Sequence, residues 1–131
     1  MPPIDWIASI VAAVSAFVLG GIWYSPVLFA KPWQADTGLS DEQLNAANKA
    51  KVFGISFIWC LLAAITFSMF LGPDPSVAFG VGAGACAGVF WVAGSFGVNY
   101  QFELKPSRLL LINGGYHAVQ FTLYGLVFGL L

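Results

Sequence analysis

Four long stretches without a charged side chain constrain this chain more than any other feature. They cover residues 6–23, 52–71, 77–98 and 109–131. About 20 residues of α-helix, at about 1.5 Å per residue, cross a hydrocarbon core of about 30 Å. Hydrophobic residues make up 59% of the sequence and charged residues only 8%, too little polar surface for a soluble domain. The sequence therefore predicts a membrane protein whose first partner is the lipid bilayer.

The connections between these stretches are short, so we expect one domain over residues 1–131. Its fold class is an all-α integral membrane protein, a four-transmembrane-helix bundle. We predict spans at about residues 5–29, 50–72, 76–99 and 108–131, with a cytoplasmic loop at 30–49. Residues 1–5 carry no basic side chain and the first stretch is longer than a typical signal core, so we interpret it as a retained helix.

The distribution of basic residues predicts the orientation of this bundle. All five lie in or beside two of the gaps between the stretches: Lys31, Lys49, Lys51, Lys105 and Arg108. Cytoplasmic loops are enriched in Lys and Arg. We therefore expect the basic loops in the cytoplasm and both termini outside. The net charge of −1, with no basic cluster, gives no reason to expect nucleic-acid binding.

Local signals predict where several helices begin and end. Asp5 can cap the first helix. Trp23 and Tyr24 suit the headgroup boundary, and Pro26 disfavours a helical Ser25. The segment from Trp23 to Pro26 is therefore an inner-face motif at which the chain leaves the membrane or kinks.

Two further expectations concern the inner side. Ser40 and Gln43 have the spacing of a capping box. The helix that starts there is expected to run through polar residues 45–51 into the second span. Glu103 and Arg108 are expected to pair across the other inner turn.

Small residues at intervals of four predict close helix packing. Ala8, Ala12, Ala16 and Gly20 follow this spacing in the first span, and Gly80, Gly84 and Gly88 in the third. The third span is expected either at the centre of the bundle or in a subunit interface. A general tolerance of membrane helices for glycine is the alternative. The tight turn at residues 72–75 predicts that spans two and three are antiparallel neighbours.

The fourth span divides into faces of different character at 100° per residue. The polar stripe contains Asn113, His117, Gln120 and Tyr124, with Tyr116 on its margin. A small-residue face contains Gly114, Ala118, Gly125 and Gly129. The bulky face, which we assign to lipid, contains Ile112, Val119, Leu123, Leu126 and Leu130.

His117 lies near the membrane midplane in this arrangement and admits two interpretations. It can tie span four to other helices through hydrogen bonds of about 0.6 kcal/mol each. Alternatively it is a working residue, because intramembrane ionisable groups often line a pathway, join a proton relay or bind a ligand. Haem with two axial ligands would need a symmetric dimer, whereas a pigment or quinone needs one histidine. The sequence identifies no cofactor, no metal site and no catalytic residue.

Two segments carry a resemblance to a known family. They are residues 19–29 (LGGIWYSPVLF), followed by Lys31 and Trp33, and residues 111–116 (LINGGY), preceded by Arg108. They resemble the bacterial membrane family catalogued as domain of unknown function 1761. The resemblance implies a small multi-pass protein of the bacterial cytoplasmic (inner) membrane with unassigned activity, and it transfers no site residue.

Three functions are compatible with these features, and none is enzymatic. The first is a structural or accessory subunit that packs in a homo-oligomer or a larger membrane complex, as the glycine-rich span favours. The second is an oligomeric small-solute transporter or channel with a polar path at His117. The third is a cofactor-binding membrane protein that uses His117 for haem, a pigment or a quinone.

Overall fold

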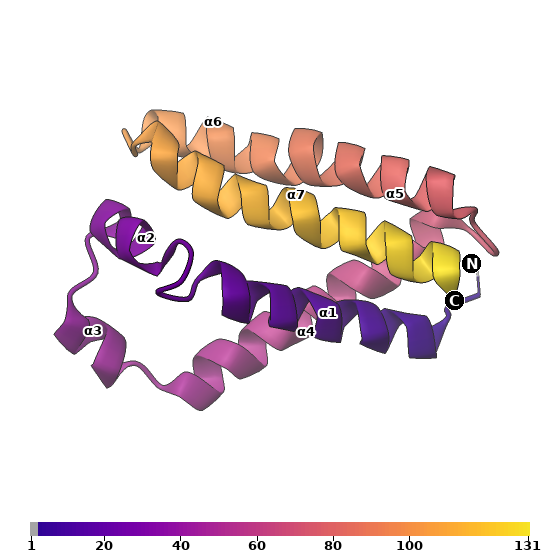
Figure 1. Ribbon diagram of the computed structural model, residues 1–131, viewed down its shortest axis with the longest axis horizontal. Helices are drawn as coiled ribbons and strands as arrows, with labels where there is room; N and C mark the ends of the chain where they lie inside the picture. The colour runs from indigo at the N-terminus through magenta and orange to yellow at the C-terminus, as the bar shows by residue number, and fades with distance from the viewer. Residues whose placement is uncertain (1–2) are drawn as a thin grey trace.

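The computed structural model describes residues 3–131, which form helices and no strand (Figure 1). The elements are α1 (Trp6–Trp23), α2 (Ala30–Thr37), α3 (Asp41–Ala46), α4 (Lys49–Leu71), α5 (Val77–Cys86), the π-helix η1 (Ala87–Ala93), α6 (Gly94–Phe102) and α7 (Ser107–Leu130). Helices α5, η1 and α6 follow one another without a break. The all-α class is confirmed.

Three helical segments are long and apolar enough to cross a membrane: Trp6–Trp23, Lys49–Leu71 and Val77–Phe102. These segments support a membrane protein. Helix α7 has 24 residues but is less apolar than these three, because the polar stripe runs along it.

Helix α7 occupies the centre of the arrangement. It packs along α5 and η1 on one side and along α1 on another, while α4 packs mainly on α1. In Figure 1, α7 runs beside the α5–α6 segment in the opposite direction. Both ends of the chain and the α4–α5 turn lie at one end, with α2, α3 and the α6–α7 turn at the other.

Of the two places expected for the glycine-rich span three, the centre of the bundle is wrong, because α7 lies there. Two further expectations are corrected. Span three contacts α4 only slightly, although the two are consecutive. The turn between them contains two positive φ angles, 79° at Gly72 and 49° at Asp74, and α4 leaves it to pack on α1. Because α1 and α5–α6 flank α7, Ile112, which the sequence pattern assigns to lipid, is buried at 4% exposure.

Close packing of the glycines is confirmed. A Cβ on Gly84 would overlap the carbonyl oxygen of Phe121, and a Cβ on Gly88 would lie 2.7 Å from the Cα of Ala118. Gly80 meets Gly125 backbone to backbone in the same way. The backbones of α5 and α7 therefore lie so close that a methyl group on this face would force them apart.

The π-helix η1 was not expected from the sequence. Gly84, Gly88, Phe96 and Tyr100 are separated by multiples of four residues, and each step of four in an α-helix rotates a face by about 40°. A π-helix has a wider turn, with hydrogen bonds from i to i+5, and so reverses this drift. As a result, the aromatic rings of Phe96 and Tyr100 reach α7 on the face that Gly84 and Gly88 began.

The alanine stripe of α1 forms the second packed face. Ala8, Ala12 and Ala16 are buried at 0–1% exposure and belong to one apolar core with Ala64 of α4 and Tyr124 of α7. Small side chains at these positions allow α1 to approach both partners, as the four-residue spacing predicted.

Two helix starts are as predicted. The Asp5 carboxylate accepts a hydrogen bond from the Ala8 amide at 2.9 Å, and Ser40 and Gln43 form a complete capping box at the start of α3.

The predicted extents of two helices were wrong. Helix α1 ends at Trp23 and not near residue 29, because Tyr24 closes it before Pro26. Helix α3 ends at Ala46 and does not run into the second span, because the side chain of Asn48 accepts from the Lys51 amide at 3.1 Å and starts α4 anew.

Candidate functional site

Asn113 joins the ends of two other helices to α7. The Tyr24 hydroxyl, just beyond α1, donates to Asn113 Oδ1 at 2.7 Å. Asn113 Nδ2 donates to the Tyr100 hydroxyl of α6 at 2.7 Å. One amide therefore bridges the C-terminal ends of α1 and α6. Tyr100 is not among the site residues predicted from the sequence, because the π-helix η1 that turns it toward α7 was not expected.

The inner-face motif divides into contacting and turn-forming residues. Trp23 Nε1 donates to the Ile112 carbonyl at 2.8 Å, and its ring covers Gly115, where a Cβ would lie 3.0 Å from Trp23 Cζ2. Trp23 and Tyr24 thus hold α7. Ser25 donates back to the Ile22 carbonyl at 2.7 Å, and the exposed Pro26 follows in the turn.

His117, Gln120 and Tyr124 form a directed chain of hydrogen bonds. The Tyr124 hydroxyl donates to the backbone carbonyl of Cys60 in α4 at 2.9 Å, and Gln120 Nε2 donates to that hydroxyl at 2.8 Å. Gln120 Oε1 is then left to accept from His117 Nδ1 at 2.6 Å. Because the Cys60 carbonyl can only accept a hydrogen bond, the Tyr124 hydroxyl, the Gln120 amide nitrogen and His117 Nδ1 must each donate in the direction of that carbonyl. His117 therefore carries its proton on Nδ1.

Tyr116, on the margin of the stripe, points to α1. Its hydroxyl donates to the Ala16 carbonyl at 3.0 Å. All five residues of the predicted stripe therefore form hydrogen bonds within the protomer: Asn113, Tyr116, His117, Gln120 and Tyr124. They connect α7 to α1, α4 and α6 in separate groups, and not as one continuous row.

Aromatic rings surround the imidazole of His117. Phe96 of α6 lies nearly parallel to it, with 5.2 Å between ring centroids and 13° between planes. Tyr116 meets it edge-on at 4.9 Å. Within residues 3–131 every fully buried side-chain nitrogen or oxygen has a hydrogen-bond partner, whereas His117 Nε2 has none. Nε2 is therefore at least partly exposed at the surface of the protomer.

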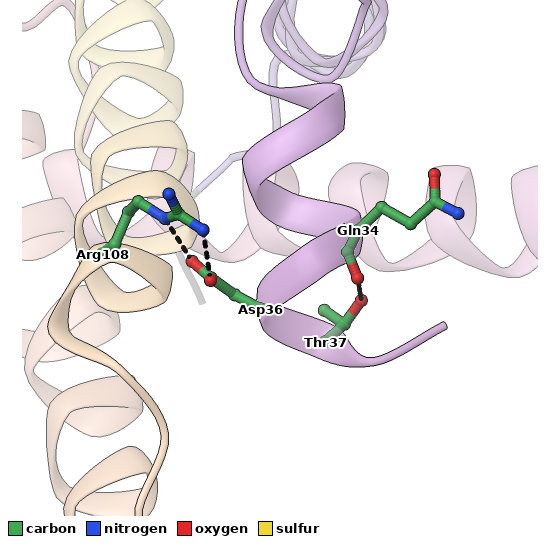
Figure 2. A network of polar contacts seen from close by, with 4 residues as sticks. All are labelled: Gln34, Asp36, Thr37 and Arg108. Atoms are coloured by element: carbon green, nitrogen blue, oxygen red, sulfur yellow. Dashed lines mark hydrogen bonds and ion pairs between the residues drawn. The ribbon is translucent and has the colours of Figure 1, made fainter. Parts of the chain in front are cut away.

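An ion pair fastens α2, in the segment between α1 and α4, to α7 (Figure 2). Arg108 donates to both carboxylate oxygens of Asp36 in α2, at 2.8 Å from Nε and 2.6 Å from Nη2. The expected pairing of Arg108 with Glu103 was wrong, because docking of α2 brings a different carboxylate to the guanidinium. The partners lie 72 residues apart, so no local pattern in the sequence could indicate this contact.

We expect the docking of α2 to depend on pH through this pair. The hydrogen bonds from Arg108 lower the pKa of Asp36 below its usual value of about 3.9. A lowered carboxyl pKa stabilises the docked form above pH about 4, and this stabilisation is lost as pH falls through the lowered pKa. Protection factors for amide exchange in α2 should therefore fall at acidic pH.

Asp36→Asn supplies the control for this measurement. It should lower protection of α2 at neutral pH and abolish its acid dependence, while exchange in α5 stays unchanged. Equal protection in both proteins at neutral pH would show that the ion pair does not hold α2 in place.

The described residues limit what the site could bind. Residues 3–131 contain no group of three or more His, Cys, Asp or Glu side chains that could hold a metal ion. Cys60 and Cys86 are free thiols on separate helices. A macrocycle whose ring nitrogens already bind its metal, or a ligand that needs a single hydrogen bond, would require only His117 from the protein.

Comparison with known proteins gives one match. No curated protein and no solved structure matches the chain. A family model described as protein of unknown function (DUF1761) matches residues 7–129. This range contains all four long helical segments except a few terminal residues, so the resemblance drawn from residues 19–29 and 111–116 is confirmed. The chain belongs to the DUF1761 family of proteins of unknown function.

Proposed function

We propose that this protein is a four-span protein of the bacterial cytoplasmic membrane and acts as a structural or accessory subunit in an assembly of its own copies. The observation that carries the proposal is a second face of small residues on α5. It consists of Ala78, Gly82, Ala85 and Cys86, about half a turn away from the glycines that meet α7.

The position of α7 supports its assignment as the fourth span. Its 24 residues correspond to about 36 Å, enough for a hydrocarbon core of about 30 Å. Helices α1 and α5–α6 flank it, so most of its polar stripe contacts protein. A span shielded in this way needs less apolar character than one that faces lipid.

Charge supports the proposed orientation. Lys31, Lys49, Lys51, Lys105 and Arg108 all belong to the end of the molecule that holds α2, α3 and the α6–α7 turn. By the positive-inside rule this end faces the cytoplasm. Both termini then face the outside.

The hydrogen bonds of the stripe support a structural role. The Asn113 amide and the hydroxyls of Tyr116 and Tyr124 bond to other segments of the same protomer. The Gln120 amide bonds to Tyr124 within α7 and reaches Cys60 Sγ of α4 at 3.9 Å. They stabilise packing. A transporter or channel with a polar path at His117 is a less supported alternative, because these groups are not free to line it.

The second small face supports association with another copy. A Cβ on Gly82 meets nothing within 4 Å, and Cys86 is exposed. Membrane helices associate through small residues at this spacing because their backbones can approach closely. A two-fold axis along the membrane normal would bring this face against the same face of a second copy.

Cys86 provides a test that needs no added residue. We expect mild oxidation in membranes to yield a disulfide-linked dimer through Cys86, visible on a non-reducing gel and abolished by Cys86→Ala. Cys60→Ala is the matched control and should leave the dimer intact, because Cys60 lies on α4 beside Gln120 and Tyr124.

Two results would contradict the assembly through this face. One is a protein that stays monomeric under oxidation. The other is a dimer whose yield is unchanged by Gly82→Leu, since a bulky side chain at Gly82 should separate the two copies without touching α7.

A further inference from the structure

We propose that His117 is a binding site, open to the membrane interior, for an apolar molecule with a hydroxyl donor, of the quinol or phenol class. The atom that binds is Nε2, which accepts a hydrogen bond from the ligand hydroxyl. This site is separate from the proposed association face on α5.

The protonation of the imidazole follows from the directed chain. The carbonyl of Cys60 fixes the Tyr124 hydroxyl as a donor, and Gln120 orients its oxygen toward His117 Nδ1. The Nδ1–H form leaves a lone pair on Nε2. The site is therefore built to accept a hydrogen bond and not to donate one.

The depth of His117 makes an unpartnered lone pair costly. His117 lies ten residues after Ser107, about 15 Å along the helix and near the middle of the proposed span. Placing a polar group in hydrocarbon without a hydrogen-bond partner costs free energy. Nε2 has no partner in the described protomer and is not sealed within it. A donor is therefore expected from outside the chain.

The surroundings of His117 favour a molecule that enters from the bilayer. His117 stacks on Phe96 of α6, and its hydrogen bonds through Gln120 and Tyr124 lead to the Cys60 carbonyl of α4. The N-terminal half of α4 diverges from α6 and α7 (Figure 1) and is exposed at Phe53 and Trp59.

The ring of Phe96 gives the site an aromatic wall. It lies nearly parallel to the imidazole, so a planar ring that meets Nε2 at its edge can also contact Phe96. Aromatic rings favour offset or edge contacts of this kind. A quinol satisfies both requirements, since it combines a planar ring with a hydroxyl donor and partitions into the hydrocarbon core.

The fixed donor pattern also predicts selectivity between redox forms. A quinol donates a hydrogen bond, whereas the corresponding quinone only accepts. Because Nε2 carries no proton, the quinone forms no hydrogen bond with it. One hydrogen bond between groups inside the membrane increases binding affinity by a factor of roughly three to twenty. We expect the reduced form to bind more tightly by about this factor.

The single histidine of the chain allows a direct test. In lipid nanodiscs, protein labelled with ¹⁵N-histidine should show a protonated Nδ1 and an unprotonated Nε2. Titration with a short-chain ubiquinol under reducing conditions should shift the Nε2 resonance saturably and leave Nδ1 protonated. The same ubiquinone, oxidised, should produce a weaker shift.

The variant Gln120→Leu tests the positioning role of the amide. It removes the acceptor for Nδ1–H, so the proton should distribute over both nitrogens and the preference for the quinol should fall. If this variant does not fold, the comparison of quinol and quinone on the native protein still decides.

The proposal would be overturned by an Nε2-protonated imidazole in the native protein, by no shift with the quinol, or by equal shifts with both redox forms. Any of these would leave the proposed assembly intact, because Cys86 reports on that assembly independently.

Discussion

Gly84→Ala should lower the free energy of unfolding by about 3 kcal/mol, at the upper end of the range for overpacked interiors. The added methyl group would overlap the carbonyl oxygen of Phe121. The atoms that the methyl group would meet all belong to the backbone of α7. They cannot rotate aside as a flexible side chain could, so α5 and α7 must separate. This loss should greatly exceed the gain of up to about 1 kcal/mol in helix propensity from glycine to alanine.

Gly54→Ala is the matched control, because a Cβ on Gly54 of α4 meets nothing within 4 Å. Thermal unfolding in one detergent, followed by circular dichroism, should show a strong decrease in Tm for Gly84→Ala and little change for Gly54→Ala. Equal melting of the two variants would contradict the close α5–α7 contact.

Asn113→Leu should have the second largest effect, a loss of about 1–3 kcal/mol. Leucine has a similar shape but removes both the bond from Tyr24 and the bond to Tyr100. Hydrogen bonds between membrane helices contribute about 0.6 kcal/mol on average and up to about 1.7 kcal/mol each. The C-terminal ends of α1 and α6 should separate from α7 as a consequence.

Tyr24→Phe and Tyr100→Phe separate the two bonds of Asn113. Each should cost less than Asn113→Leu in the same unfolding assay, and neither should add much when combined with it, since Asn113→Leu already removes its partner. Full additivity of Tyr24→Phe with Asn113→Leu would show that the amide does not bridge these helices.

Local chemistry made much of this fold predictable. The apolar stretches mark the three helices that could cross a membrane. Asp5 and Ser40 cap helices as expected because capping depends on residues within one turn. The close packing at Gly84 was also predictable from local sequence, because small residues spaced by four lie on one face of a helix.

Long-range features were not predictable from these patterns. Periodicity cannot say which helix holds the centre, so the burial of Ile112 was missed. The π-helix needs a change of helical pitch that glycine and alanine permit but do not specify. The pairing of Asp36 with Arg108 depends on where α2 docks.

The candidate site shows the same division. The stripe from Asn113 to Tyr124 follows from helical periodicity, and these side chains do contact other helices. Their partners do not follow from it. Tyr24, Tyr100, Phe96 and the Cys60 carbonyl come from segments outside α7. Of these, the Cys60 carbonyl determines which nitrogen of His117 is protonated.

The accessibility of Leu131 tests most directly whether α7 is a fourth span. With single cysteines labelled by a membrane-impermeant maleimide on intact spheroplasts, Leu131→Cys and Asp74→Cys should react, and Asp41→Cys only after the membrane is opened. The parent protein is the control, because Cys60 and Cys86 lie within proposed spans. If Leu131→Cys reacts only after opening while Asp74→Cys reacts from outside, α7 does not cross the membrane and the four-span account is wrong.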